Sequence, residues 1–183
     1  MPTPRDILIF RHIANEGPGT FTDFLDRHRL PYRIIRIDRG ERVPEALGET
    51  PALVFMGGSM SVNDTLPWIP KSLALIRAAV AADRPVLGHC LGGQLLSKAL
   101  GGHVGRNRRK EIGWLPVRRL DNPAARDWLG ALPPRFEVFH WHGETFSIPP
   151  GATNILESAN CRHQMFVIGK SLGMQCHVEM TPA

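Results

Sequence analysis

The chain has 183 residues, 43% of them hydrophobic, and a formal net charge of +5, which is ordinary for one domain with a real core. No apolar run approaches the length of a membrane-spanning helix, and no N-terminal segment has the basic, apolar and small-residue order of a signal peptide. Three cysteines, an odd number, suit a reducing compartment better than a disulfide framework, so we expect a cytoplasmic protein without membrane contact.

Short apolar runs alternate with helical patterns through the first half of the chain. The runs predict strands, and apolar residues at helical spacing, such as Phe21, Phe24 and Leu25, predict helices. In chain order we expect strand 6–11, helix 20–30, strands 32–37 and 52–56, helix 70–82, strand 85–88 and helix 91–100. Short strands separated by helices are typical of a parallel sheet covered on both faces.

After Gly102 the pattern changes to a strand-rich stretch. We expect strands at 113–120, 136–141, 154–158, 165–168 and 172–177, with a short helix over 123–132. No internal repeat or low-complexity linker interrupts the sequence. The predicted fold is therefore α/β, a flavodoxin-like open and mostly parallel sheet with helices on both faces and a strand-rich C-terminal half, in a single domain over 1–183.

The most informative motif follows the predicted strand 85–88, where Cys90 stands in the pattern Gly-x-Cys-x-Gly between Gly88 and Gly92. This is the pattern of a nucleophile elbow, a strand-to-helix turn so tight that its flanking residues must be small. The turn also points the amino end of the next helix at the sulfur, and that partial positive charge favours a thiolate. The alternative is a buried structural cysteine in a glycine-rich turn.

A base for this cysteine is available near the end of the chain, where His177 and Glu179 stand two residues apart. Alternate side chains of a strand share a face, so one segment can supply both a base and the group that orients it. Cys161 and Cys176 are expected to be inert buried thiols, and strand alternation points Cys176 away from His177.

Three other features surround this pair. Gly57 and Gly58 follow the predicted strand 52–56, where a glycine loop lets backbone amides approach an oxyanion, although a plain turn explains them equally well. Gln94 lies one helical turn past Cys90, so its amide can face either the same pocket or solvent. His140 and His142 alternate on a predicted strand, but no third ligand is evident, so we expect no metal.

The basic run 106–110 is the densest cluster of charge in the chain. The run predicts a solvated loop, and the alternative is a contact for an acidic partner or a phosphorylated acceptor. No aromatic residues alternate with these charges, so we expect no nucleic-acid binding.

Together these motifs resemble the class I glutamine amidotransferases, closest to the GMP-synthase-like branch. The elbow from Gly88 to Gln94 resembles the family's Gly-x-Cys-x-Gly-x-Gln, and residues 175–179 resemble its closing Gln-Phe-His-Pro-Glu. The glycine loop 56–62 and the segments 111–114 and 140–146 also read like that branch. The resemblance covers residues 6–179, and its departures at Ser59, Cys176 and Val178 remove no catalytic group.

The resemblance implies a role for each of these residues. Cys90 would be the nucleophile, His177 the base and Glu179 its orienting group, while the backbone amides of Gly58 and Leu91 would form an oxyanion hole. The residues implied to bind substrate are Gly57, Gln94, His140, Trp141 and His142, with Gln94 holding the amino-acid end of glutamine.

The implied activity is hydrolysis of the glutamine side-chain amide without a cofactor, with ammonia passed to an acceptor on a synthetase partner. A γ-glutamyl peptidase using the same three groups is the alternative, and a non-enzymatic regulatory protein of this fold is disfavoured by the intact set. The chain ends four residues after Glu179, whereas the family continues, so we expect either a trimmed chain or an exposed closing strand.

Overall fold

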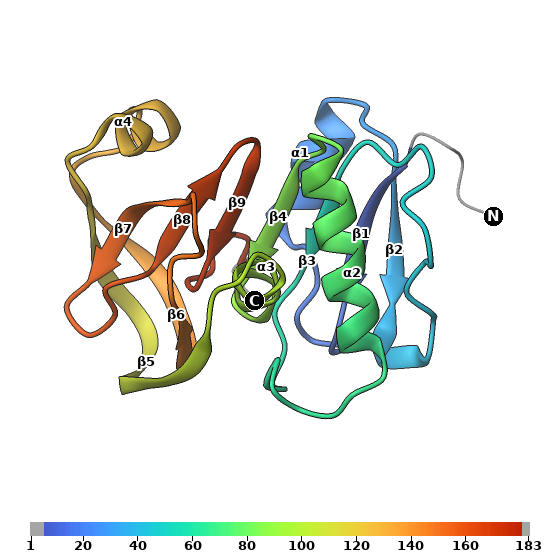
Figure 1. Cartoon of the computed structure of the whole chain (residues 1–183). Coiled ribbons are helices and arrows are strands. Elements are labelled where there is room, and N and C mark those ends of the chain that lie inside the picture. The colour runs from blue at the N-terminus through green and yellow to red at the C-terminus, as the bar shows by residue number, and fades with distance from the viewer. Residues whose placement is uncertain (1–5, 181–183) are drawn as a thin grey trace.

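The computed structural model describes residues 6–180. Within this range every named strand joins one nine-stranded sheet with the order β2-β1-β3-β4-β9-β8-β7-β5-β6. The parallel strands are β1 (Ile7–Arg11), β2 (Tyr32–Arg36), β3 (Leu53–Phe55), β4 (Val86–His89) and β9 (Ser171–Met174). The strands joined by antiparallel pairing are β5 (Val104–Arg119), β6 (Arg135–Phe146), β7 (Thr153–Ser158) and β8 (Met165–Ile168), and they form the other half of the molecule in Figure 1.

The order β2-β1-β3-β4-β9 is that of flavodoxin-like sheets, in which ligands bind outside the carboxyl ends of the strands. The sequence therefore predicts the fold class correctly, including the strand-rich C-terminal half. The helices are α1 (Thr20–Arg27), α2 (Trp68–Ala81), α3 (Leu91–Ala99) and α4 (Pro123–Leu129), with a short 3₁₀ helix, η1 (Ile37–Arg39), after β2.

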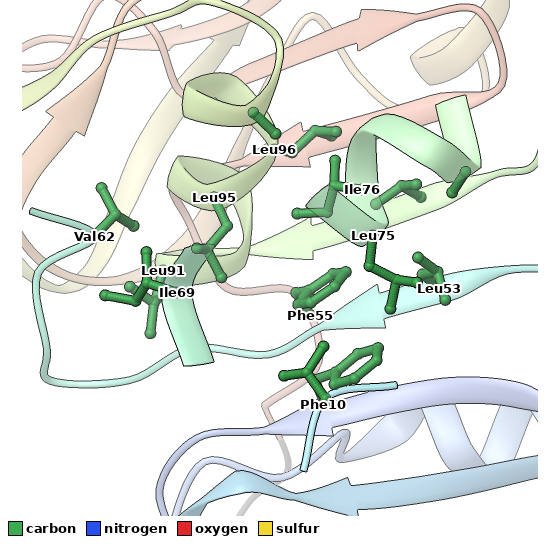
Figure 2. Packing of buried hydrophobic residues seen from close by; sticks show 14 of the residues in the cluster. Phe10, Leu53, Phe55, Val62, Ile69, Leu75, Ile76, Leu91, Leu95 and Leu96 are labelled. Carbon is green, nitrogen blue, oxygen red and sulfur yellow. The ribbon is translucent and has the colours of Figure 1, made fainter. Parts of the chain in front are cut away.

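Strand alternation assigns α1 and the pair α2–α3 to opposite faces of the parallel half. Ile9 and Val54 point toward Leu25 of α1, while Phe10 and Phe55 point the other way. The rings of Phe10 and Phe55 stack with centroids 4.4 Å apart, and Figure 2 shows them beneath leucines and isoleucines of α2 and α3. Burying each large apolar side chain contributes about 1.5–3 kcal/mol, so this packing holds α3, the helix that follows Cys90, firmly on the sheet.

Several predicted elements differ from the structure in type or in length. The basic run Arg106 to Lys110 is not a loop but part of β5, at an irregularity where the pairing with β6 shifts between Arg106 and Glu111. The last predicted strand ends at Met174, and His177 lies beyond it, joined to Phe139 by an isolated bridge.

Helix α1 also stops short of the predicted residue 30. Arg29 has a φ of 54°, a left-handed conformation that no α-helix continues. Among residues 6–180, no helix combines the length and the apolar character that crossing a bilayer requires.

Candidate active site

Cys90 occupies a strained turn between β4 and α3. Its φ of 50° lies in the region that favours glycine, and its amide donates to the carbonyl oxygen of Met174 over 2.9 Å. The glycines around it have no room for a side chain, because a Cβ at Gly88 would lie 2.4 Å from Gly92 and one at Gly92 would lie 2.0 Å from the Phe55 oxygen. This close packing is what a nucleophile elbow requires.

His177 and Glu179 form a buried pair although neither belongs to a strand. Nδ1 of His177 lies 2.7 Å from Oε1 of Glu179, and the amide of Val178 donates to Oε2 of the same carboxylate over 2.9 Å. Both side chains are almost fully buried. The carboxylate is therefore fixed by its own bend in the chain, and it fixes the orientation of the imidazole in turn.

A second histidine approaches the same carboxylate from the elbow. Nε2 of His89 lies 3.6 Å from Oε2 of Glu179, and the His89 ring is fully buried. Burial lowers the pKa of His89 more than the charge of Glu179 raises it. His89 was given no role in the sequence reasoning, because it is only the variable residue of the elbow motif.

The electrostatics of the pair favour a charged imidazole beside a charged carboxylate. Burial alone would lower the pKa of His177, but its neighbours Cys90 and Glu179 raise it to about 10. Burial raises the pKa of Glu179, but the hydrogen bond with His177 and the nearby histidine charges outweigh that effect and lower it. Nε2 of His177 has no hydrogen-bond partner of normal length among the described residues, so it is available to a group entering from the Cys90 side.

The sulfur of Cys90 is surrounded by amides. Nε2 of Gln175 lies 3.6 Å from Sγ and the Trp141 carbonyl oxygen 4.0 Å from it. Nε2 of Gln94 donates to Oε1 of Gln175 over 3.1 Å, so Gln94 reaches the sulfur through Gln175. Sequence reasoning placed Gln175 in a motif without a role, and its contact with Cys90 depends on how β9 and the elbow meet in space.

The predicted oxyanion residues lie close together. A Cβ at Gly58 would stand 2.9 Å from the Leu91 side chain, and one at Gly57 would stand 3.1 Å from Cε1 of His177. The glycine loop after β3 therefore lies against both the first residue of α3 and the imidazole.

A cavity of about 520 Å³ opens beside Cys90. Of the residues predicted from sequence, Gly58, Cys90, Gln94, Trp141 and His142 line it. The cavity is also lined by Ser61 of the glycine loop, Lys110 of the basic run and Glu144 of the segment 140–146, and by Asp64, which lies outside every predicted motif. The polar lining residues and the thiol suit a small polar substrate.

Comparison with known proteins identifies the family of this chain. Residues 25–183 match the model of the class-I glutamine amidotransferases. The chain belongs to this family. It is 31% identical to the glutamine amidotransferase-like protein YfeJ of Salmonella typhimurium, over 93% of this chain and 74% of that protein. It is also 31% identical to a glutamine-hydrolysing GMP synthase subunit of Sulfolobus acidocaldarius, over 74% of this chain and 71% of that protein.

A solved structure agrees over nearly the whole chain. The glutamine amidotransferase of Methylobacillus flagellatus superposes with a TM-score of 0.93 at 47% identity, covering 96% of this chain and 71% of that one. The chain spans only about a quarter of the length of two GMP synthases that it also matches.

His140 of this chain does not line the cavity but belongs to a buried polar cluster behind it. His142 faces oxygen atoms on both sides, with Nδ1 2.9 Å from the Glu144 carbonyl and Nε2 3.1 Å from Oε2 of Glu111. Nδ1 of His140 lies 3.7 Å from the same carboxylate oxygen. Glu111 is the third potential metal ligand that the sequence did not reveal.

The cluster is already joined by hydrogen bonds. Nε2 of Gln164 lies 2.7 Å from Oε2 of Glu111 and about equally far, 3.4 and 3.5 Å, from the ring nitrogens of His140 and His142. A metal ion would need its ligands at about 2.0–2.2 Å, and the amide occupies the space between them. The absence of a metal stays a prediction.

The remaining predicted residues lie away from the cavity. Cys161 and Cys176 are buried, and burial raises the pKa of both thiols. Residues 107–109 of the basic run border a separate cavity of about 560 Å³ together with Arg162 and His163. A role for that run as an anion contact stays a prediction.

Proposed function

We propose that this chain carries out the glutaminase half-reaction of a glutamine amidotransferase, with Cys90 as nucleophile, His177 as base and Glu179 as its orienting group. One observation carries the proposal: the buried imidazole is held at Nδ1 by Glu179 over 2.7 Å, while its Nε2 is unsatisfied on the side of a cysteine that lines a polar cavity. A nucleophile, a base within reach and a third group that orients the base are the requirements of covalent catalysis.

The reaction proceeds in two steps. His177 takes the proton of the Cys90 thiol, and the sulfur attacks the side-chain carbonyl carbon of glutamine to give a tetrahedral oxyanion. His177 returns the proton to the amide nitrogen, the carbon–nitrogen bond breaks, and ammonia leaves a γ-glutamyl thioester. Water then gives a proton to His177 and attacks the thioester carbon, so glutamate leaves and the thiol regains its proton.

The amides of Gly58 and Leu91 are our candidates for the oxyanion hole. Leu91 is the first residue of α3, where the backbone N–H has no partner within the helix, and Gly58 lies against its side chain. An oxyanion donor is typically worth roughly 3 kcal/mol in the transition state. No cofactor takes part in either step.

The cavity walls suit the zwitterionic end of an amino acid. Lys110 from β5 and Glu144 from β6 line the cavity with opposite charges, and Asp64 adds a second carboxylate. Lys110 would pair with the α-carboxylate of glutamine and the acidic side chains with its α-ammonium group. Gln94, Trp141 and His142 complete this wall, whereas Gly57 and His140 act from behind it.

Similarity to the Sulfolobus GMP synthase subunit supports a synthetase partner that receives the ammonia.

A γ-glutamyl hydrolase is the second candidate, because a cavity of about 520 Å³ has room for a leaving group larger than ammonia. A cytoplasmic location is part of the proposal, because catalysis by a thiol needs Cys90 reduced.

The proposal is tested with a glutamine-analogue electrophile and a coupled glutamate assay. The electrophile should modify Cys90 and spare Cys161 and Cys176, and glutamate release should disappear in Cys90→Ala while Cys161→Ser retains it. Modification that persists in Cys90→Ala, or glutamate release unchanged by that substitution, would exclude Cys90 as the nucleophile.

A further inference from the structure

We propose that Glu16 is a second acidic positioning residue of the site, whose carboxylate supports the charged form of His177 from the edge of the ring that neither Glu179 nor Cys90 contacts. The inference rests on the proposed function, in which His177 accepts the proton of Cys90. It assigns a role to the loop between β1 and α1, which the mechanism above does not use.

Glu16 and His177 meet at Gly57. A Cβ built on Gly57 would lie 2.0 Å from Oε2 of Glu16 and 3.1 Å from Cε1 of His177. The carboxylate oxygen and the imidazole carbon therefore both approach Gly57 on the side where a Cβ would stand. Oε2 of Glu16 is buried and has no hydrogen-bond partner among the described residues. A buried carboxylate oxygen without a donor is costly unless a positive charge lies nearby, and the imidazolium is the charge available.

The loop that carries Glu16 is held at both ends against the active site. At one end Nδ1 of His12 lies 3.0 Å from the carbonyl oxygen of Met56, the first residue of the glycine loop. At the other end the amide of Thr20 donates to the Glu179 carbonyl oxygen over 3.0 Å. The position of Glu16 between the glycine loop and the imidazole is thus fixed by contacts to both.

The loop lies before the segment that matches the family model. The family match begins at residue 25, so Glu16 lies outside the segment on which membership rests. Sequence reasoning gave Glu16 no role, because nothing in its local pattern links it to a histidine near the other end of the chain.

The effect of Glu16 on the charged form of His177 depends on the other groups around the imidazole. Glu179 faces Nδ1, Cys90 lies on the Nε2 side, and Glu16 lies at Cε1, while His89 and His140 act at longer range. Burial raises the pKa of Glu16, the charge of His177 opposes that effect without cancelling it, and the negative charge of Glu179 adds to the rise. Proton uptake by His177 and proton loss by Glu16 therefore favour each other, as in any coupled pair of opposite charges.

The test is the titration of His177 in protein labelled with ¹³C at histidine Cε1, with the resonance assigned by His177→Ala. Glu16→Gln removes the negative charge beside the His177 imidazolium. We therefore expect the midpoint pH of the His177 titration to fall by roughly one pH unit. Glu16→Asp keeps the charge and should recover part of that shift. Glu45→Gln, which changes an exposed glutamate, is the matched control and should leave the midpoint unchanged.

An identical His177 midpoint in wild type, Glu16→Gln and Glu45→Gln would overturn the proposal. Should Glu16→Gln fail to fold, the wild-type spectrum still decides, because protonation of Glu16 must move the His177 Cε1 resonance and no movement refutes the contact. Neither measurement needs glutamine. If the His177 shift appears but the protein releases no glutamate from glutamine, the inference about Glu16 stands and only the proposed function fails.

Discussion

The carbonyl oxygen of Phe55 lies directly against the α-carbon of Gly92, so that a Cβ there would stand only 2.0 Å from it. Phe55 ends β3, and Gly92 is the second residue of α3. The contact sets how closely the helix approaches the sheet, and with it the position of Cys90 two residues earlier. Cys90 is therefore placed by backbone packing rather than by its own side-chain contacts.

Substituting Gly92→Ala should separate α3 from β3 and displace Cys90. Over-packing of this kind costs about 1–3 kcal/mol of folding free energy, and a displacement of about 1 Å can cost a hundredfold in rate. We expect a stable but slower enzyme, measured by urea unfolding and by turnover of glutamine. Gly105→Ala is the control, since a Cβ there meets nothing within 4 Å, and equal effects of the two substitutions would contradict the argument.

Glu179→Gln should slow turnover while leaving a folded protein. Loss of the corresponding carboxylate in a serine-protease triad costs about four orders of magnitude, and we expect a smaller loss because a cysteine is the better nucleophile. The His177 pKa, which Glu179 helps to raise to about 10, should fall in the same variant. If Glu179→Gln turned over saturating glutamine at the wild-type rate, Glu179 would have no part in the mechanism. Glu137→Gln, on the exposed side of β6, is the control.

Gln175 links Gln94 to the sulfur of Cys90, and its substitutions separate hydrogen bonding from charge. Gln175→Leu removes the donor that lies 3.6 Å from Sγ of Cys90. A hydrogen bond to a charged group contributes about 1.5–3 kcal/mol. Its loss from the transition state corresponds to a fall in kcat of roughly 10- to 100-fold. Gln175→Glu keeps an acceptor for Gln94 but sets a negative charge beside the sulfur, so its kcat should fall further. A kcat unchanged in both variants, measured at saturating glutamine, would show that the amide chain is only structural.

The parts of the site that the sequence predicts are those encoded by local patterns. The elbow is one continuous segment, and the helices before and after it show their apolar periodicity directly. Strand β5 was too short in the prediction because most of its side chains are exposed, so its basic first half shows no apolar alternation. The segment of His177 and Glu179 was assigned to a strand, yet the two side chains meet in a bend beyond Met174.

Other functional neighbours depend on distant segments meeting in space. Glu16 reaches His177 across the sheet, and Glu111 reaches His142 from the neighbouring strand. The sequence separation between each of these glutamates and its histidine matches no recognisable motif, so the sequence does not indicate either pair. The motif that contains Glu111 does not indicate that it accepts hydrogen bonds in the buried cluster, because that role depends on the fold.

The buried cluster around Glu111 predicts a specific acid sensitivity. Burial raises the pKa of Glu111, but hydrogen bonds from His142 and Ser158 outweigh that effect and lower it. A lowered folded-state pKa contributes stability that is present above the unfolded value of about 4.5 and is lost as the pH falls through the folded value. The free energy of unfolding of Glu111→Gln should lie well below that of wild type at pH 7, and the gap should narrow below pH 4.5.

Urea unfolding at several pH values measures that gap. The exposed Glu137→Gln provides the control, with stability close to wild type throughout. A gap that stays constant between pH 7 and the acid range would mean that the Glu111 charge does not contribute.

The last prediction concerns the products of the isolated chain. The sequence shows neither Gly-x-Gly-x-x-Gly nor a P-loop, so we do not expect it to activate an acceptor with ATP. Without an acceptor, water completes the reaction, and glutamine should yield ammonia and glutamate in equal amounts. We expect the rate to be low until a partner closes the cavity, because Trp141 at its rim is half-exposed.

Coupled detection of ammonia and glutamate checks this, with glutamine and a γ-glutamyl dipeptide offered side by side and Cys90→Ala as the blank. In the proposed mechanism the same oxyanion amides and the same His177–Glu179 pair would act on either substrate, so the ratio of the two rates would report only what the cavity does with the leaving group. Faster glutamine turnover, or a rise in it when an ammonia-accepting synthetase is added, supports the amidotransferase. Brisk dipeptide cleavage with negligible ammonia release from glutamine would favour the γ-glutamyl hydrolase instead, because the cavity would then be using its spare volume to bind the larger leaving group.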